Sequence, residues 1–229
     1  MKPLSELNEL RELDLSKCDL SDVEFFPELP ELRKLRLSFI QPSTTDAAKP
    51  ESQLKFLRQQ KSVEDLTVYI DDHVSDLGFI EHLPNLKSLW IHGCSEIKNL
   101  DELSGATQLE NLWLKPCSKL ENLNAIKAHP SLQVLSIGGC NLAEIGWLGN
   151  CENLVDLELR EFETLVSLDG IQELNNLKRI NLNGCVNLTS IEPLLQIPNL
   201  KNVNLAGCIE IPQLQIDQLR KTAEQVVGK

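Results

Sequence analysis

The stretch Leu109-Glu110-Asn111-Leu112-Trp113-Leu114-Lys115-Pro116-Cys117 contains the pattern that decides the fold, L-x-x-L-x-L-x-x-C. The same phrase, with other residues at some of its positions, occurs nine times in the chain of 229 residues. Its first residues are Leu10, Leu32, Val63, Leu86, Leu109, Leu132, Leu154, Leu177 and Leu200. Successive starts are 22 or 23 residues apart, except for one interval of 31. A phrase that returns in phase nine times indicates a repeat architecture.

Each phrase predicts a short strand. In x-L-x-L-x the side chains alternate between two faces, so the two leucines point inward and their neighbours point outward. One such strand cannot bury its apolar face alone, so we expect successive units to stack into a parallel sheet over a continuous core. A second phrase, such as Leu120-x-x-Leu123-x-x-Ile126, fills the rest of each unit. Its three-residue spacing is typical of short 3₁₀ or irregular turns.

These nine units resemble the leucine-rich-repeat family. Repeats of 22–23 residues are similar to those of the internalin-like bacterial class and of the regulatory-subunit class associated with protein phosphatase 1, with Cys mostly in place of the usual Asn. The resemblance implies an α/β solenoid, a right-handed horseshoe with a parallel sheet on its concave face and short turns on its convex face. We assign residues 1–211 to this solenoid and residues 212–229 to a C-terminal capping helix.

Six of the seven cysteines occupy one position of the repeat and form what we call the cysteine row: Cys18, Cys94, Cys117, Cys140, Cys185 and Cys208. In the family this position holds an inward residue that caps the backbone where the strand ends, and a thiol is a small apolar group with a weak donor. A row of metal ligands or a redox pair is the alternative, but no C-x-x-C or Cys/His cluster occurs. We therefore predict buried, reduced thiols, while Cys151 lies outside the row and has no predicted role.

Four glycines each precede a cysteine of the row: Gly93, Gly139, Gly184 and Gly207. This placement predicts tight turns that need unusual backbone angles or close packing. A phosphate-binding loop would require a G-x-G-x-x-G or G-x-x-x-x-G-K pattern, and the sequence contains neither.

The two ends and the second unit depart from the repeat. The segment from Pro212 to Val227 predicts an amphipathic helix with Ile216, Leu219, Ala223 and Val226 on one face, which we interpret as a cap; a partner-binding helix is the alternative. The chain opens in the middle of a repeat, so it is either part of a longer protein or uses the half-unit as a lid. An insertion near residues 41–60 has the composition of an exposed loop, followed by a predicted short helix.

Composition narrows the possible functions. A net charge of −12 argues against nucleic acid as a partner, because phosphate binding needs a cationic surface. No secretory signal and no apolar run of about 18 residues occur, so we expect no membrane association and a cytoplasmic location. The four histidines have no metal-ligand spacing, and no nucleophile motif appears. The sequence thus predicts neither an enzyme nor a cofactor.

The outward positions of the strands predict where a partner binds. The single Tyr and two of the three Trp, namely Tyr69, Trp90 and Trp113, fall at such positions on three consecutive strands. Exposed aromatic side chains are enriched in binding hot spots, although the two tryptophans could also simply cover each other. The predicted site comprises Thr67, Tyr69, Trp90, His92, Trp113 and Lys115, flanked by Asp156, Glu158 and Arg160. We also expect Glu161 to extend an acidic patch there.

These features favour a monomeric, non-enzymatic module that recognises another protein through its concave face. Two other functions remain open. The chain could be a ligand-sensing or autoinhibitory module of a larger signalling protein, responding to a small ligand or carbohydrate, or it could be an accessory domain of an enzyme.

Overall fold

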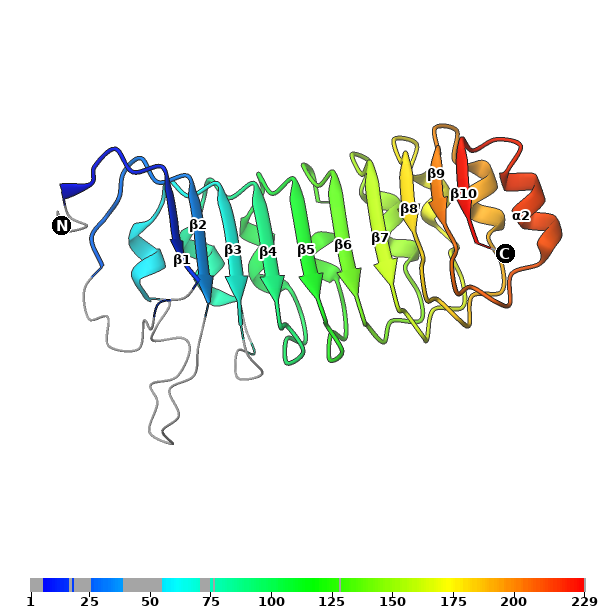
Figure 1. The fold of residues 1–229 in the computed structure, drawn as a ribbon, viewed down its shortest axis with the longest axis horizontal. Helices are drawn as coiled ribbons and strands as arrows, with labels where there is room; N and C mark the ends of the chain where they lie inside the picture. Colours follow the sequence, from blue (N-terminus) through cyan, green and yellow to red (C-terminus); the bar gives the residue numbers. More distant parts are fainter. Residues whose placement is uncertain are drawn as a thin grey trace.

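The computed structural model describes residues 6–16, 18, 26–38, 55–70, 75, 77–127 and 129–228. Within them, ten strands form one all-parallel sheet in which each strand lies between its neighbours in the sequence (Figure 1). The strands are β1 (Glu12–Leu15), β2 (Lys34–Ser38), β3 (Asp65–Tyr69), β4 (Ser88–His92), β5 (Asn111–Lys115), β6 (Val134–Gly138), β7 (Asp156–Arg160), β8 (Arg179–Asn181), β9 (Asn202–Asn204) and β10 (Gln225–Val227). The predicted leucine-rich-repeat solenoid is confirmed.

The strands alternate as the repeat predicts. In the sheet, residues at the same position of neighbouring repeats pair with each other. Leu66, Leu89 and Leu112 therefore lie side by side in β3, β4 and β5. All three are fully buried in the single core that runs along the solenoid. Burying a leucine side chain contributes about 1.5–3 kcal/mol, and the same contribution recurs at every inward position. The outward residues of the ten strands form the opposite surface, which we call the sheet face.

Short 3₁₀ turns lie behind the sheet, as predicted (Figure 1). They are η2 (Lys55–Gln59), η3 (Gly78–His82), η4 (Asp101–Gly105), η5 (Asn124–Ile126), η6 (Gly146–Asn150), η7 (Ile171–Glu173) and η8 (Glu192–Gln196). Their apolar residues, such as Leu103 and Leu148, are buried against the core. Most of the insertion near residues 41–60 lies outside the described residues, apart from η2, in which Leu57 is buried.

Asparagine side chains connect neighbouring repeats just before the strands begin, a feature that the sequence analysis missed. Each Nδ2 donates a hydrogen bond of 2.6–2.9 Å to a backbone carbonyl of the preceding repeat. The pairs are Asn85 with Lys61, Asn153 with Pro130, Asn176 with Glu152 and Asn199 with Asn175. These bonds satisfy backbone groups in the turns, where no sheet partner is available.

The cysteine row is buried from Cys94 onward. The Sγ atoms of Cys94 and Cys117 lie 2.9 Å apart, and Cys208 donates its thiol to the Leu182 carbonyl at 3.0 Å. Burial raises the pKa of the Cys185 thiol to about 12, and the neighbouring thiols raise the pKa of Cys117. These groups are therefore neutral packing residues, as predicted.

One cysteine prediction was wrong, and the structure gives Cys151 a position that was not predicted. Cys18 is exposed, and Leu13 and Leu15 in the same repeat are only partly buried. Cys151, which had no predicted role, is fully buried and donates its thiol to the Ile126 carbonyl at 3.2 Å. It occupies the inward position that follows a 3₁₀ turn, where the next repeat has Leu174.

The C-terminal segment differs in part from the prediction. The capping helix is confirmed, but it is short: α2 spans Gln213–Leu219, with Ile216 and Leu219 buried against the last repeat. Val226, which we expected on the same helix, lies in β10, paired with Val203 of β9. The chain thus closes the sheet with one more strand, which protects the backbone edge of β9.

Backbone angles support the turn assignment of the glycines. Gly93, Gly139, Gly184 and Gly207 all have positive φ, with values of 89°, 67°, 78° and 80°. A side chain at Gly93 would also collide with the Ile70 carbonyl, since a Cβ there would lie 2.0 Å from its oxygen. Among the described residues, no helix has the length and hydrophobicity needed to span a bilayer.

Candidate functional site

Four rings on β3, β4 and β5 stack on the sheet face, and we call Tyr69, Trp90, His92 and Trp113 the aromatic cluster. The Trp90 and Trp113 rings are 3.9 Å apart between centroids, with 17° between their planes. The Tyr69 and His92 rings are 4.5 Å apart with 9° between their planes. The two stacks meet where the Trp90 and His92 rings lie 6.4 Å apart.

Sheet register produces these stacks. Trp90 pairs with Trp113, and Tyr69 pairs with His92, because each pair holds the same repeat position in neighbouring strands. Strands about 4.8 Å apart place such rings within stacking distance. Tyr69 and Trp90 nevertheless stay 41% and 36% exposed, so stacking alone leaves much of their surface in contact with solvent.

His92 is part of an uncharged surface at neutral pH. Burial lowers the pKa of its imidazole, and the positive charge of Lys115 lowers that pKa further. The ring therefore contributes to the cluster as a neutral aromatic side chain. In the described part of the chain, no group of three or more His, Cys, Asp or Glu side chains is arranged to hold a metal ion.

A polar network around Glu158 adjoins the cluster. The Glu158 carboxylate accepts hydrogen bonds from Ser136 Oγ at 2.8 Å, Lys115 Nζ at 3.0 Å and Arg160 Nη2 at 3.1 Å. Burial raises the pKa of Glu158, but these hydrogen bonds and the two positive charges outweigh that effect and lower it overall. The carboxylate is therefore ionised and fully paired.

Lys115 reaches Glu158 across an intervening strand. Lys115 is in β5 and Glu158 is in β7, so the lysine side chain must cross β6 at Gly138. A Cβ at Gly138 would lie 3.2 Å from Lys115 Cγ, tighter than an ordinary contact. Glycine at this position therefore leaves room for the lysine side chain to bridge two strands.

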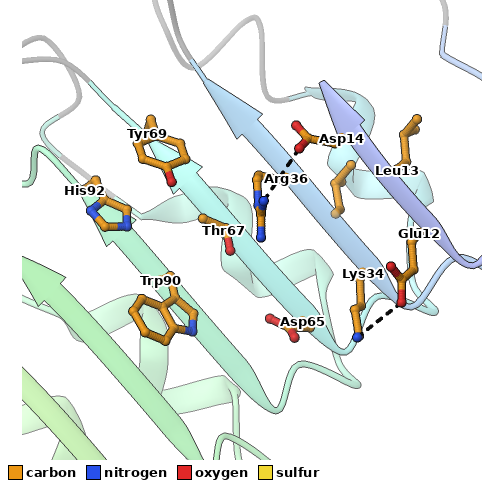
Figure 2. Close-up of a pocket in the computed structure, with 11 residues that line it drawn as sticks. Glu12, Leu13, Asp14, Lys34, Arg36, Asp65, Thr67, Tyr69, Trp90 and His92 are labelled. Carbon is orange, nitrogen blue, oxygen red and sulfur yellow. Dashed lines mark ion pairs between the residues drawn. The ribbon is translucent and has the colours of Figure 1, made fainter. Parts of the chain in front are cut away.

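A hollow of about 650 Å³ lies beside the aromatic cluster on the sheet face, over β1 to β4 (Figure 2). Tyr69, Trp90, His92 and Thr67 form one side of it. The other residues that line it are Glu12, Leu13, Asp14, Lys34, Leu35, Arg36 and Asp65. Ligand sites commonly have volumes of about 300–1,000 Å³, so this hollow is large enough to receive side chains of a partner.

The charged residues of the hollow are mostly paired. Lys34 Nζ lies 3.2 Å from Glu12 Oε1, and Arg36 Nη1 lies 3.6 Å from Asp14 Oδ2, as the dashed lines in Figure 2 mark. Both pairs are largely exposed, so each contributes at most about 1 kcal/mol. The two pairs neutralise four of the charged residues that line the hollow.

The structure brings most of the predicted site residues together. Thr67, Tyr69, Trp90 and His92 line the hollow, and Trp113 stacks behind Trp90. Lys115, Glu158 and Arg160 form the adjoining network. Asp156 lies further along the sheet, 2.8 Å from Arg179, so two of the three acids of the expected patch, Asp156 and Glu158, are in ion pairs. Glu161 follows β7, and no ion pair of the described residues includes it.

The predicted site omitted Asp65, Ser136 and Gly138, although all three hold outward strand positions. Asp65 lines the hollow two positions before Thr67 on the same strand, and this outward phase could have identified it. Ser136 holds an outward position yet is fully buried beneath its neighbours. Its register neighbours are the larger side chains of Trp113 and Glu158, and its hydroxyl donates to the Glu158 carboxylate.

The in-phase repeat, the all-parallel sheet and the 3₁₀ turns show that this chain has a leucine-rich-repeat fold. It is structurally similar to an internalin, InlF, from Listeria monocytogenes, with a TM-score of 0.60 and 21% sequence identity over 87% of this chain and 62% of that one. The functional domain of InlJ from Listeria monocytogenes, which includes a cysteine ladder, gives a TM-score of 0.60 and 18% identity over 95% of this chain and 48% of that one.

The chain thus spans less than two thirds of the length of each of these two structures. Identities of 21% and 18% show a shared fold and no more. No family model matches the sequence, and a comparison with curated proteins finds no relative.

Proposed function

We propose that this chain is a non-catalytic recognition module that binds a protein partner on its sheet face, with the aromatic cluster as the main contact. The observation that carries the proposal is the pair of ring stacks on β3 to β5, in which Tyr69 and Trp90 remain 41% and 36% exposed. Leucine-rich-repeat solenoids present extended concave surfaces that suit binding.

The energetics of the rings support this assignment. Large aromatic side chains bury much apolar area with few rotatable bonds, and they are enriched in the hot spots of protein interfaces. Stacking fixes the rings before a partner arrives, so little conformational entropy is lost when it binds. A preformed apolar patch of this kind is more useful to a binding protein than to a catalyst, which needs reactive groups.

The polar surroundings favour a protein partner. The Glu158 network and the ion pairs of the hollow form a charged rim around the rings, and protein interfaces commonly combine an aromatic centre with such a rim. We further propose that the chain acts as a monomer and that it works in a reducing, cytoplasmic setting. Its free thiols support the second point. The location predicted from the sequence stays a prediction.

The test is affinity capture with the full chain as bait, followed by calorimetry on the purified partner. Trp90→Ala and Tyr69→Ala should each weaken binding by about tenfold or more. Ile209→Ala is the matched control, since Ile209 is a 62% exposed apolar residue outside the strands. If all three variants bind the partner equally well, the sheet face is not the binding surface.

A further inference from the structure

Asp65 is the one charged residue of the hollow that has no pairing partner among the described residues. It lies on β3 between Lys34 and Ser88 in the sheet register. Lys34 pairs instead with Glu12 on its other side, and Arg36 pairs with Asp14. Burial raises the pKa of Asp65, and the charges of Lys34 and Arg36 offset that effect only in part. A carboxylate held in this way destabilises the folded chain at neutral pH, which is typical of groups kept for binding.

The open ring face of Trp90 lies beside this carboxylate. One face of the ring stacks on Trp113, on the β5 side. The other face is directed toward β3, where the register partner is the short Thr67. Figure 2 shows Trp90, Thr67 and Asp65 lining the same hollow, with no large side chain drawn between the ring and the carboxylate.

The charge left in the hollow is negative. Two ion pairs neutralise four of its charged residues, namely Lys34 with Glu12 and Arg36 with Asp14. His92 adds no charge at neutral pH, because burial lowers its pKa. One negative charge therefore remains, next to an aromatic face that attracts cations.

We propose that this hollow is a subsite for an arginine side chain of the protein partner. The guanidinium would stack on the open face of Trp90 and donate its N–H groups to the Asp65 carboxylate. Arginine fits better than lysine because its planar group can stack on a ring and form two parallel hydrogen bonds to one carboxylate. The inference rests on the proposed function and adds a chemical requirement to it: the partner presents an arginine to β3 and β4.

The probe is a short peptide, acetyl-Gly-Arg-Gly-amide, titrated into the full chain while the amide signals of β3 and β4 and the Trp90 indole N–H are followed by NMR. The control peptide has citrulline in place of arginine, which keeps the shape and removes the charge. We expect saturable shifts at Asp65, Thr67 and Trp90 with the arginine peptide, and at least about tenfold weaker binding of the citrulline peptide. Absence of shifts, or equal binding of both peptides, would overturn the proposal.

Asp65→Asn should weaken binding of the arginine peptide by about tenfold or more. Glu64→Gln is the matched control: it removes one negative charge from the neighbouring residue, which pairs with Lys87 and does not line the hollow. This variant should bind as the wild type does, whereas an equal loss in both variants would show attraction by net charge alone and contradict the subsite.

The arginine subsite and the proposed function can be refuted independently of each other. A captured partner that depends on Trp90 but tolerates Asp65→Asn refutes the arginine subsite only, and one that tolerates Trp90→Ala and Tyr69→Ala refutes the function itself.

Discussion

The two halves of the sheet face are built from the same repeat but satisfy their outward side chains differently. Between β3 and β5 the outward positions hold stacked, exposed rings and the carboxylate of Asp65, which has no ion-pair partner in the described part of the chain. From β7 to β10 they hold polar groups that bind one another: Arg179 with Asp156, and Asn202 with Gln225. Asn181 and Asn204 each accept a backbone N–H two residues further along. Because these polar groups of the second half bind one another, we expect the partner to bind mainly on the first half.

The largest effect should come from removing the C-terminal cap, which lies next to β9 at the end of the β7 to β10 half. Deletion from Pro212 onward takes away Ile216 and Leu219, which are both buried, and removes β10 from the edge of β9. Losing two buried aliphatic side chains alone costs about 3 kcal/mol or more. We expect a lower Tm and concentration-dependent association, measured by calorimetry and light scattering, because an apolar end and a strand edge are uncovered. A monomeric chain with an unchanged Tm would contradict the capping role.

The second effect separates the two halves directly. Trp90 and Asn181 hold the same repeat position in β4 and β8, so Trp90→Ala and Asn181→Ala are matched changes. Trp90→Ala should reduce the free energy of partner binding by about 2 kcal/mol or more, whereas Asn181→Ala should leave it within about 0.5 kcal/mol. Isothermal calorimetry measures both. Loss of the stack with Trp113 should also destabilise the Trp90 variant by about 1 kcal/mol. A large loss of stability in Trp90→Ala with unchanged partner binding would show that the rings stabilise the fold and do not bind the partner.

A smaller effect concerns Glu158, which we expect to stabilise the fold. Its pKa in the folded chain is lowered, so the stabilisation is fully present above the pKa of the unfolded chain and is lost as pH falls through the lower folded value. Glu158→Gln should therefore destabilise the chain by about 1 kcal/mol or less at neutral pH. Urea unfolding at pH 7 and near pH 3 should show that the difference shrinks in acid. A loss of stability in Glu158→Gln that is larger near pH 3 than at pH 7 would contradict the stabilising role of the Glu158 network.

The smallest effect has the opposite sign and concerns Asp65. Its pKa in the folded chain is raised, so the protonated form is favoured there and the carboxylate costs stability as pH rises through the folded pKa. Asp65→Asn should leave stability unchanged or raise it by up to about 0.5 kcal/mol at pH 7. Below the ordinary pKa of aspartate, 3.8, the wild type and Asp65→Asn should have nearly equal free energies of unfolding. Urea unfolding across this range checks the sign, and marked destabilisation at pH 7 would mean that Asp65 has a structural partner.

Periodic features could be predicted from the sequence because each copy confirms the others. The inward leucines, the parallel sheet, the 3₁₀ turns and the stack of Trp90 on Trp113 all follow from equal repeat positions in neighbouring strands. The capping helix was also predictable from its apolar face, but β10 was not. Gln225–Val227 is a single copy without the repeat phrase, and only pairing with β9 makes it a strand.

Features that depend on a choice of rotamer could not be predicted. Lys34 has acidic neighbours on both sides, Glu12 and Asp65, and the sequence does not tell which one it will pair with. The bridge from Lys115 to Glu158 passes Gly138, one strand away from both, where a Cβ would lie only 3.2 Å from Lys115 Cγ. Side-chain packing therefore determines the chemistry of the candidate site, while the repeat determines its position.

The most direct test of the difference between the two halves is hydroxyl-radical footprinting of the chain with and without its captured partner. Tyr69 and Trp90 are reactive aromatic residues that are 41% and 36% exposed, and Leu214 and Val227 are 70% and 44% exposed at the other end. We predict that the partner protects Tyr69 and Trp90 from oxidation and leaves Leu214 and Val227 as reactive as in the free chain. Protection of Leu214 and Val227 with unchanged oxidation of Tyr69 and Trp90 would contradict the assignment of partner binding to the aromatic cluster.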